Sequence, residues 1–234
     1  MEVISELLTR LGGKFSTELG LTVAANPEER QKWFLAAILL GAPISGLLAS
    51  RTYRLMADQE VTTPDAVLSR GWDGLVVLLD KGGYTRYDFK TATKLLAAMT
   101  TLKEKYQGYL ERLAAVARDP VDLERRLQDL ASGIGPTTVN IFLRELRGIW
   151  PQAQPFLSPL ARLAAAHLGL IPNDLPATMA WKTLVAHWET QPVPGFEVSD
   201  LEAALVRLGR DFCRKPAKPC PFKPWCKRES FSPK

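Results

Sequence analysis

The sequence predicts an all-α fold, and three observations support this prediction. Apolar residues recur at helical spacing along most of the 234 residues. Runs that alternate between apolar and polar residues, as half-buried strands do, are nearly absent. Prolines and glycines divide the chain into segments of ordinary helix length. Together these patterns indicate helices packed on helices.

The first half of the chain carries clear signals for helix starts. Asn26 is a good N-cap, and Pro27-Glu28-Glu29 supplies a proline and two acids that suit a helix start. The apolar stretch 33–40 follows, and Pro43 ends or bends that helix. The further helices predicted in this half cover residues 45–57, 64–69, 72–79 and 87–109, with a break at 81–83.

In the second half, two helices at 120–130 and 136–146 are separated by a short glycine-containing turn. Pro151 and Pro155 indicate a linker. The remaining predicted helices cover residues 159–168, 176–190 and 199–212.

The turn at Gly133-Ile134-Gly135 is the most informative motif. Glycine tolerates positive φ and lets bare backbone approach a ligand. Pro136 suits the first turn of the next helix, whose free N–H groups, including those of Thr137 and Thr138, form a site for an anion such as a DNA phosphate. The alternative is a plain helical hairpin with a glycine-rich corner.

Charge is concentrated at the C-terminus. Of 30 Lys/Arg and 25 Asp/Glu, seven basic residues and one acid lie in 213–234, which leaves 23 basic and 24 acidic residues elsewhere. A basic tail, with Lys215 and Lys218 near its start, suits a polyanion through sequence-independent affinity. A solvated surface tail is the alternative.

Composition argues against several classes of protein, namely membrane-spanning, secreted and disulfide-rich proteins. With 46% hydrophobic and 24% charged residues, the chain resembles an ordinary globular protein. No apolar run approaches the roughly 20 residues of a membrane span. The acidic N-terminus is unlike a signal peptide, so we expect a cytoplasmic protein. Three cysteines, Cys213, Cys220 and Cys226, do not suggest a disulfide scaffold.

Many helices, a Gly-Ile-Gly hairpin past the middle and C-terminal cysteines together resemble the helix-hairpin-helix DNA glycosylases of the endonuclease III superfamily, over roughly residues 26–226. The resemblance implies two helical domains flanking a cleft that receives a flipped base. We therefore expect one domain at 26–150, with the hairpin at 123–146, and a second formed by 1–25 plus 151–234. A monomer bound to double-stranded DNA is expected.

Two positions depart from the family. Members with lyase activity carry a lysine two residues after the second hairpin glycine, where this chain has Thr137. The family's catalytic aspartate falls at Leu157 when its following arginine is matched to Arg162. There is no acidic residue between Gly148 and Asn173, and leucine cannot stabilise a developing cation.

Asp88 is the candidate substitute for the missing acid. Together with Tyr84, Arg86 and Tyr87 it combines stacking, phosphate-pairing and acidic groups, as a base pocket would. Arg86 is accordingly a candidate DNA contact. The alternative is that Asp88 simply caps the helix that follows it.

The cysteines match the family's iron–sulfur motif, Cys-x6-Cys-x2-Cys-x5-Cys, only in part. Cys213 to Cys220 reproduces the first interval and Cys220 to Cys226 the last, but neither register supplies four cysteines. An incomplete iron–sulfur site and a loop held by Pro and Trp225 packing both remain open.

The sequence thus predicts a DNA-binding protein of base-excision repair. As an enzyme it would hydrolyse the N-glycosidic bond of a damaged or mispaired base without lyase activity. The alternatives are a catalytically inactive protein that binds DNA damage or DNA structure, and a helical protein-interaction scaffold.

Overall fold

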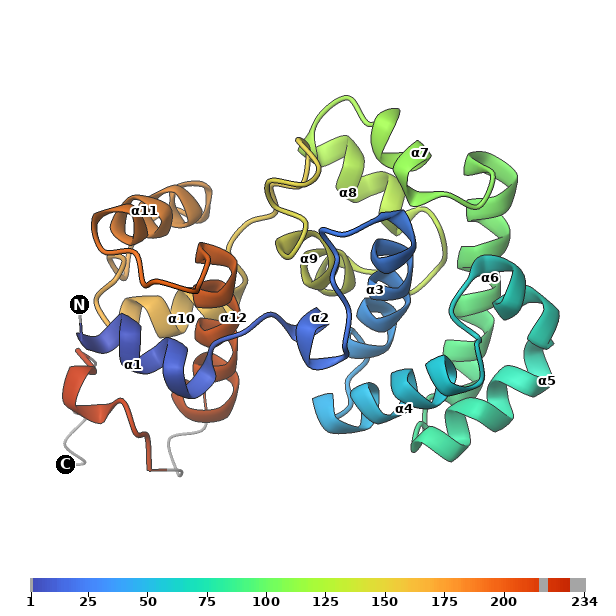
Figure 1. Cartoon of the computed structure of the whole chain (residues 1–234), viewed down its shortest axis with the longest axis horizontal. Coiled ribbons are helices and arrows are strands. Elements are labelled where there is room, and N and C mark those ends of the chain that lie inside the picture. The colour runs from blue at the N-terminus through green and yellow to red at the C-terminus, as the bar shows by residue number, and fades with distance from the viewer. Residues whose placement is uncertain (1, 215–218, 228–234) are drawn as a thin grey trace. The chain divides into compact units, whose positions relative to one another are not determined.

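The computed structural model describes residues 2–214 and 219–227, and these residues form helices, turns and loops without any strand (Figure 1). The all-α prediction is confirmed. The chain divides into two compact units. We call residues 16–155 the hairpin unit, and residues 1–15 together with 156–234 the tail unit.

The hairpin unit is a bundle of helices that runs from blue at α2 through green to olive-yellow at α9 in Figure 1. Its helices are α3 (Pro27–Leu40), α4 (Gly46–Asp58), α5 (Pro64–Gly82), α6 (Asp88–Tyr106), α7 (Leu110–Ala115), α8 (Pro120–Gln128) and α9 (Pro136–Arg144), and the short α2 (Phe15–Glu18) begins at the boundary.

Helix α3 is the centre of this bundle. All residues from 33 to 39 are buried, and α3 contacts α4, α6, α7 and α9. Trp33 Nε1 donates to the carbonyl of Phe142 on α9 at 3.1 Å, and the Phe34 and Phe142 rings meet edge to face. A helix that is apolar on all sides needs neighbours around its whole circumference.

Local signals set the helix starts. The Asn26 side chain accepts a hydrogen bond from the N–H of Glu29 at 2.9 Å, as the capping prediction requires. Ser45 does the same for Leu48 at the start of α4. The two helices predicted at 64–69 and 72–79 lie within α5, on either side of a kink at Gly71, whose φ of +69° and ψ of 173° are not helical.

The segment that precedes α3 is tied to the hairpin unit. The N–H of Ser16 donates to Glu145 Oε2 at 3.0 Å, and Arg54 donates to the carbonyl of Glu18. Arg30 donates to the carbonyl of Val23. The units therefore divide after residues 15 and 155, whereas the sequence-based boundaries stood after 25 and 150.

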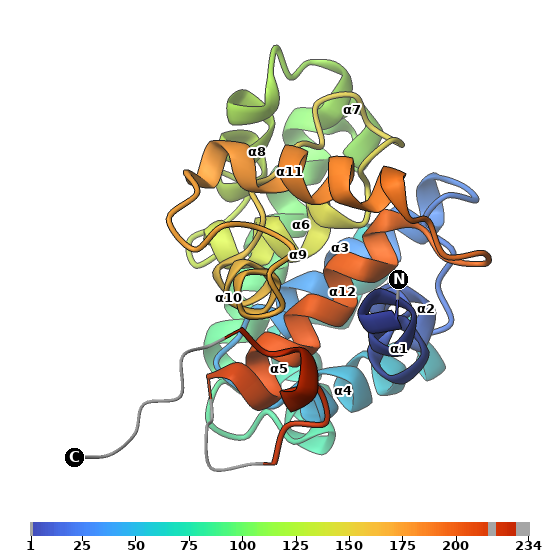
Figure 2. The same ribbon diagram turned by 90° about the vertical axis from the view of Figure 1, so that its left-hand side faces the viewer.

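The tail unit contains α1 (Glu2–Leu11), α10 (Pro159–His167), α11 (Ala177–Thr190), α12 (Val198–Leu208), a π-helical turn (Gly209–Cys213) and a 3-10 turn (Lys223–Trp225). Helix α12 is buried from 201 to 208 and packs against α1 and α10 (Figure 2). Arg207 fastens the end of α1, because it donates to the carbonyls of Leu11 and Gly13.

Candidate nucleic-acid interface

The turn between α8 and α9 is a tight corner that needs only one of its glycines. Gly133 has φ +87°, a conformation that L side chains rarely adopt. The N–H of Ile134 donates to the carbonyl of Ala131 at 3.1 Å, and the Ile134 side chain is buried. Ile134 was expected to present its N–H to a ligand. Instead, both its N–H and its side chain hold the turn in place.

Gly135 is different, because the fold places no demand on it. It is the N-cap of α9, with φ −101° and ψ −179°, which is extended backbone open to any residue. A Cβ built on Gly135 would have no described atom within 4 Å. Residues such as Ser or Asp are better N-caps than Gly. The backbone at this position is therefore bare without a structural reason inside the described residues.

Unused donors surround Gly135. Among the described residues, the N–H groups of Gly133, Gly135, Thr137 and Thr138 have no acceptor, and the first bond of α9 runs from Val139 to the carbonyl of Gly135. These groups lie at the start of a helix, where the peptide dipoles favour negative charge. The turn can thus hold an anion by backbone alone.

The Thr138 side chain is buried in the hairpin unit, although its backbone N–H is one of the free donors. Thr138 is 2% exposed and lies against Gly41, where a Cβ would come within 2.1 Å of its Oγ1. The side chain therefore fixes the start of α9 against the end of α3. Thr137, in contrast, is exposed.

The loop at 83–87 is anchored to the same end of α3. Tyr84 is 1% exposed, and its hydroxyl donates to the carbonyl of Leu39. Burial raises the pKa of Tyr84 well above its usual value. The expectation that Tyr84 lines a base pocket is wrong, because its ring and hydroxyl belong to the core. The hairpin and this loop nevertheless both attach to the last turn of α3.

Asp88 and Arg86 flank Tyr87 at the surface of this loop. Asp88 is the first residue of α6 and is half-buried, and its Oδ1 accepts from the N–H of Phe89 at 2.7 Å. The carboxylate thus sits where a helix start favours an acid. Arg86 is exposed, with its guanidinium 5.6 Å from the centre of the Tyr87 ring.

Position 157, where the family resemblance implies an aspartate, is buried. Leu157 is 2% exposed in the tail unit, and the neighbouring Ser158 caps α10 by accepting from the N–H of Ala161. The segment is therefore an ordinary helix start with a leucine inserted into the core. It contributes no group that could bear or orient charge.

The described residues show no metal-ligand group around the three cysteines. Each is partly exposed, and within 2–214 and 219–227 no three His, Cys, Asp or Glu residues are grouped as metal ligands. Residues 219–227 are held by Phe222, which is 1% exposed, and by the N–H of Lys227, which donates to the carbonyl of His167. The candidate DNA contacts Lys215 and Lys218 lie outside the described residues.

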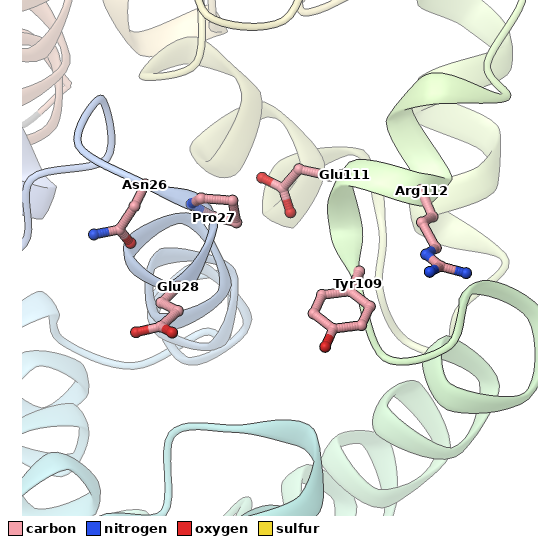
Figure 3. A pocket seen from close by; sticks show the side chains of 6 residues that line it. All are labelled: Asn26, Pro27, Glu28, Tyr109, Glu111 and Arg112. Carbon is pink, nitrogen blue, oxygen red and sulfur yellow. The ribbon is translucent and has the colours of Figure 1, made fainter.

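Two surface hollows of the hairpin unit lie elsewhere. One, of about 520 Å³, is formed between the start of α3 and α7, where Glu111 accepts a hydrogen bond from Arg30 (Figure 3). The other, of about 700 Å³, lies at the end of α6 beside Arg112 and Arg126. Neither is lined by the turn or by residues 80–88.

One residue near the turn has no signal in the sequence. Lys94, in the second turn of α6, places its Cε 2.9 Å from the point that a Cβ on Gly133 would occupy. Nothing in the local pattern distinguishes Lys94 from the other lysines of this helix, because the contact joins segments distant in the chain.

Comparison with known proteins gives a fold but no close relative. No family model matches the sequence, and neither does any curated protein. Two solved structures match at TM-scores of 0.57 and 0.58 with 20% and 21% identity: a trapped endonuclease III–DNA covalent intermediate in an estranged-adenine complex, and a non-covalent endonuclease III–DNA complex. Each match covers 97% of this chain and 92% of the other.

The match extends over both units. Among the described residues, no helix has the length and apolar character that a membrane span requires. The chain has an endonuclease III-like fold.

Proposed function

We propose that this protein binds duplex DNA by holding a backbone phosphate at the turn between α8 and α9. The observation that carries the proposal is Gly135, which is bare although neither its φ nor its surroundings require glycine. A ligand that must touch the backbone explains this absence of a side chain.

The chemistry of the turn suits a phosphate. Four N–H groups without acceptors lie at the positive end of α9. They could bind an anion although the turn itself has no charged side chain. Contacts of this kind position a protein on DNA and carry no sequence information. The likeness to two endonuclease III structures that contain DNA supports the same ligand.

The test is Gly135→Asp. Aspartate is a good N-cap, so the midpoint of thermal unfolding should stay the same or rise. A carboxylate at this position would repel a phosphate, so affinity for a duplex at low salt should fall at least tenfold, which corresponds to about 1.4 kcal/mol. Thr178→Asp adds the same charge in the exposed first turn of α11 and serves as the matched control.

Two outcomes would overturn the proposal. One is that wild-type protein shows no binding to duplex DNA at low salt. The other is that Gly135→Asp and Thr178→Asp bind with the same affinity as the wild type.

A second candidate function is hydrolysis of an N-glycosidic bond with Asp88 as the acid. The observation that favours it is Tyr84, which anchors the loop before Asp88 to the same turn of α3 that carries the start of α9. A carboxylate there would orient a water molecule for attack on the sugar anomeric carbon. The bond to the base would break, and the base would leave with a proton.

Base release from a panel of lesion-bearing duplexes separates this activity from binding alone. Asp88→Asn retains an oxygen that can accept from Phe89, so the helix start is preserved. Release that disappears in Asp88→Asn would support the enzyme. Release that persists would remove Asp88 as the catalyst, and the absence of release from every duplex would favour a binding protein.

A further inference from the structure

Lys94 is packed against the turn rather than extended into solvent. Its Cε and Nζ lie 2.9 and 3.5 Å from the place where a Cβ on Gly133 would stand, so the methylene stem covers one side of the loop. Gly133 therefore has two reasons to be glycine, its positive φ and the space that Lys94 occupies.

The ammonium of Lys94 has no counterion within 2–214 and 219–227. Among the described residues no carboxylate forms an ion pair with it and no acceptor takes a hydrogen bond from it, whereas Lys103 on the same helix pairs with Asp65. Burial lowers the pKa of Lys94. A half-buried cation without a partner is unfavourable, and an anion placed beside it would relieve that cost.

We propose that the Lys94 ammonium is a ligand of the DNA backbone at this turn, where it contacts a phosphate together with the free N–H groups of Gly133 and Gly135. This inference rests on the proposed function. The turn supplies backbone N–H donors, and Lys94 supplies the full positive charge that the turn lacks. A charge-assisted hydrogen bond from Lys94 would strengthen phosphate binding.

The experiment measures the salt dependence of duplex binding for Lys94→Met. Methionine keeps an apolar stem beside Gly133 but removes the charge, so thermal stability should be preserved. One lost phosphate contact should reduce the slope of log K against log salt by about 0.9. Lys105→Met removes the same charge from an exposed position in the last turn of α6 and should leave the slope near that of the wild type.

The outcomes distinguish this inference from the proposed function. If the wild type does not bind, the proposed function fails. If the wild type binds and Gly135→Asp does not, but Lys94→Met keeps the wild-type slope, only the assignment of Lys94 is overturned.

A measurement on the wild-type protein avoids any effect of substitution on folding. Lysines are acylated by an amine-reactive reagent with and without duplex DNA, and the extent at each position is determined by mass spectrometry. A phosphate on the Nζ of Lys94 should protect it several-fold more than Lys105. Equal acylation of Lys94 with and without bound DNA would contradict the proposal.

Discussion

The turn at 133–135 and the segment at 155–159 differ in how many of the chemical groups implied by the family resemblance they retain. The turn has free backbone donors and an open approach at Gly135. The segment has the buried Leu157 where the family resemblance implies a carboxylate. Phosphate binding needs only backbone geometry, whereas catalysis needs a particular side chain.

This contrast means that binding and chemistry can be tested independently. The turn lies in the hairpin unit and Leu157 in the tail unit, and each unit has its own buried core. A substitution in the turn should therefore alter DNA binding, and a substitution at position 157 should alter the stability or the catalytic activity of the tail unit. The predictions that follow are ordered by the size of the expected effect.

The strongest test of the contrast is Leu157→Asp, which restores the residue type that the resemblance implies. Because Leu157 is 2% exposed, the change removes apolar burial and places a carboxylate without a partner in the core. We expect a loss of at least about 4 kcal/mol in the free energy of unfolding, measured with urea.

The control is Leu157→Met, which conserves volume and should cost less than about 1.5 kcal/mol. A Leu157→Asp protein with wild-type stability that releases bases from DNA would break the contrast, because position 157 would then face the reacting groups.

The segment 219–227 offers a second test, because Phe222 is buried there whereas Cys220 and Cys226 are partly exposed. Phe222→Ala should destabilise the tail unit by about 3 kcal/mol, because the ring is 1% exposed. Replacing all three cysteines by serine should change thermal stability little, since they are partly exposed and belong to no metal-ligand group within 2–214 and 219–227. Absorbance near 400 nm and iron analysis of protein purified without oxygen provide the check. A stoichiometric cluster would overturn this account of the tail.

Local signals in the sequence were sufficient for most of the helices. Asn26 and Ser45 cap the helices that follow them because an N-cap needs only the N–H groups two or three residues later. The same holds for Gly133, whose positive φ serves a turn within a few residues. Gly71 likewise marks the break between the helices predicted at 64–69 and 72–79, because its φ of +69° and ψ of 173° interrupt the helical backbone inside α5.

The site could be predicted only where its parts are local. Thr138 packs on Gly41, and Tyr84 donates to Leu39, so both side chains serve contacts between distant segments. The cation beside the turn, Lys94, comes from a helix that precedes the turn by a wide interval in sequence. Such contacts depend on how helices pack, which helical periodicity alone does not specify.

A smaller effect concerns the first helix of the hairpin. On α8, Arg125 together with the N–H of Arg118 and the side chain of Arg126 holds the pKa of Asp122 well below its usual range. Since the folded pKa is lowered, the stabilisation is present above the unfolded value of about 3.9 and is lost as pH falls below it. Asp122→Asn should therefore be less stable than the wild type at pH 6.

At pH 3 the difference in stability between Asp122→Asn and the wild type should be smaller, which urea unfolding at the two pH values can measure. An equal difference at both pH values would show that the carboxylate's charge does not support the hairpin. Because α8 leads into the turn, loss of this support should also weaken duplex binding.

The last prediction is that no covalent complex forms between the protein and DNA. Lyase chemistry requires an amine that attacks the anomeric carbon and forms a Schiff base, and Thr137 stands where the family's lysine would be. Reduction with borohydride in the presence of DNA containing an abasic site should therefore trap no protein.

Lys94 is the lysine that this experiment must consider, because burial lowers its pKa and so favours the neutral, nucleophilic amine. Because Lys94 packs against Gly133, we expect its ammonium to contact a phosphate and not a sugar carbon. Lys94→Met should therefore leave the trapping result unchanged. A trapped complex that disappears in Lys94→Met would reverse this conclusion, and the hairpin would then contribute to the chemistry as well as to binding.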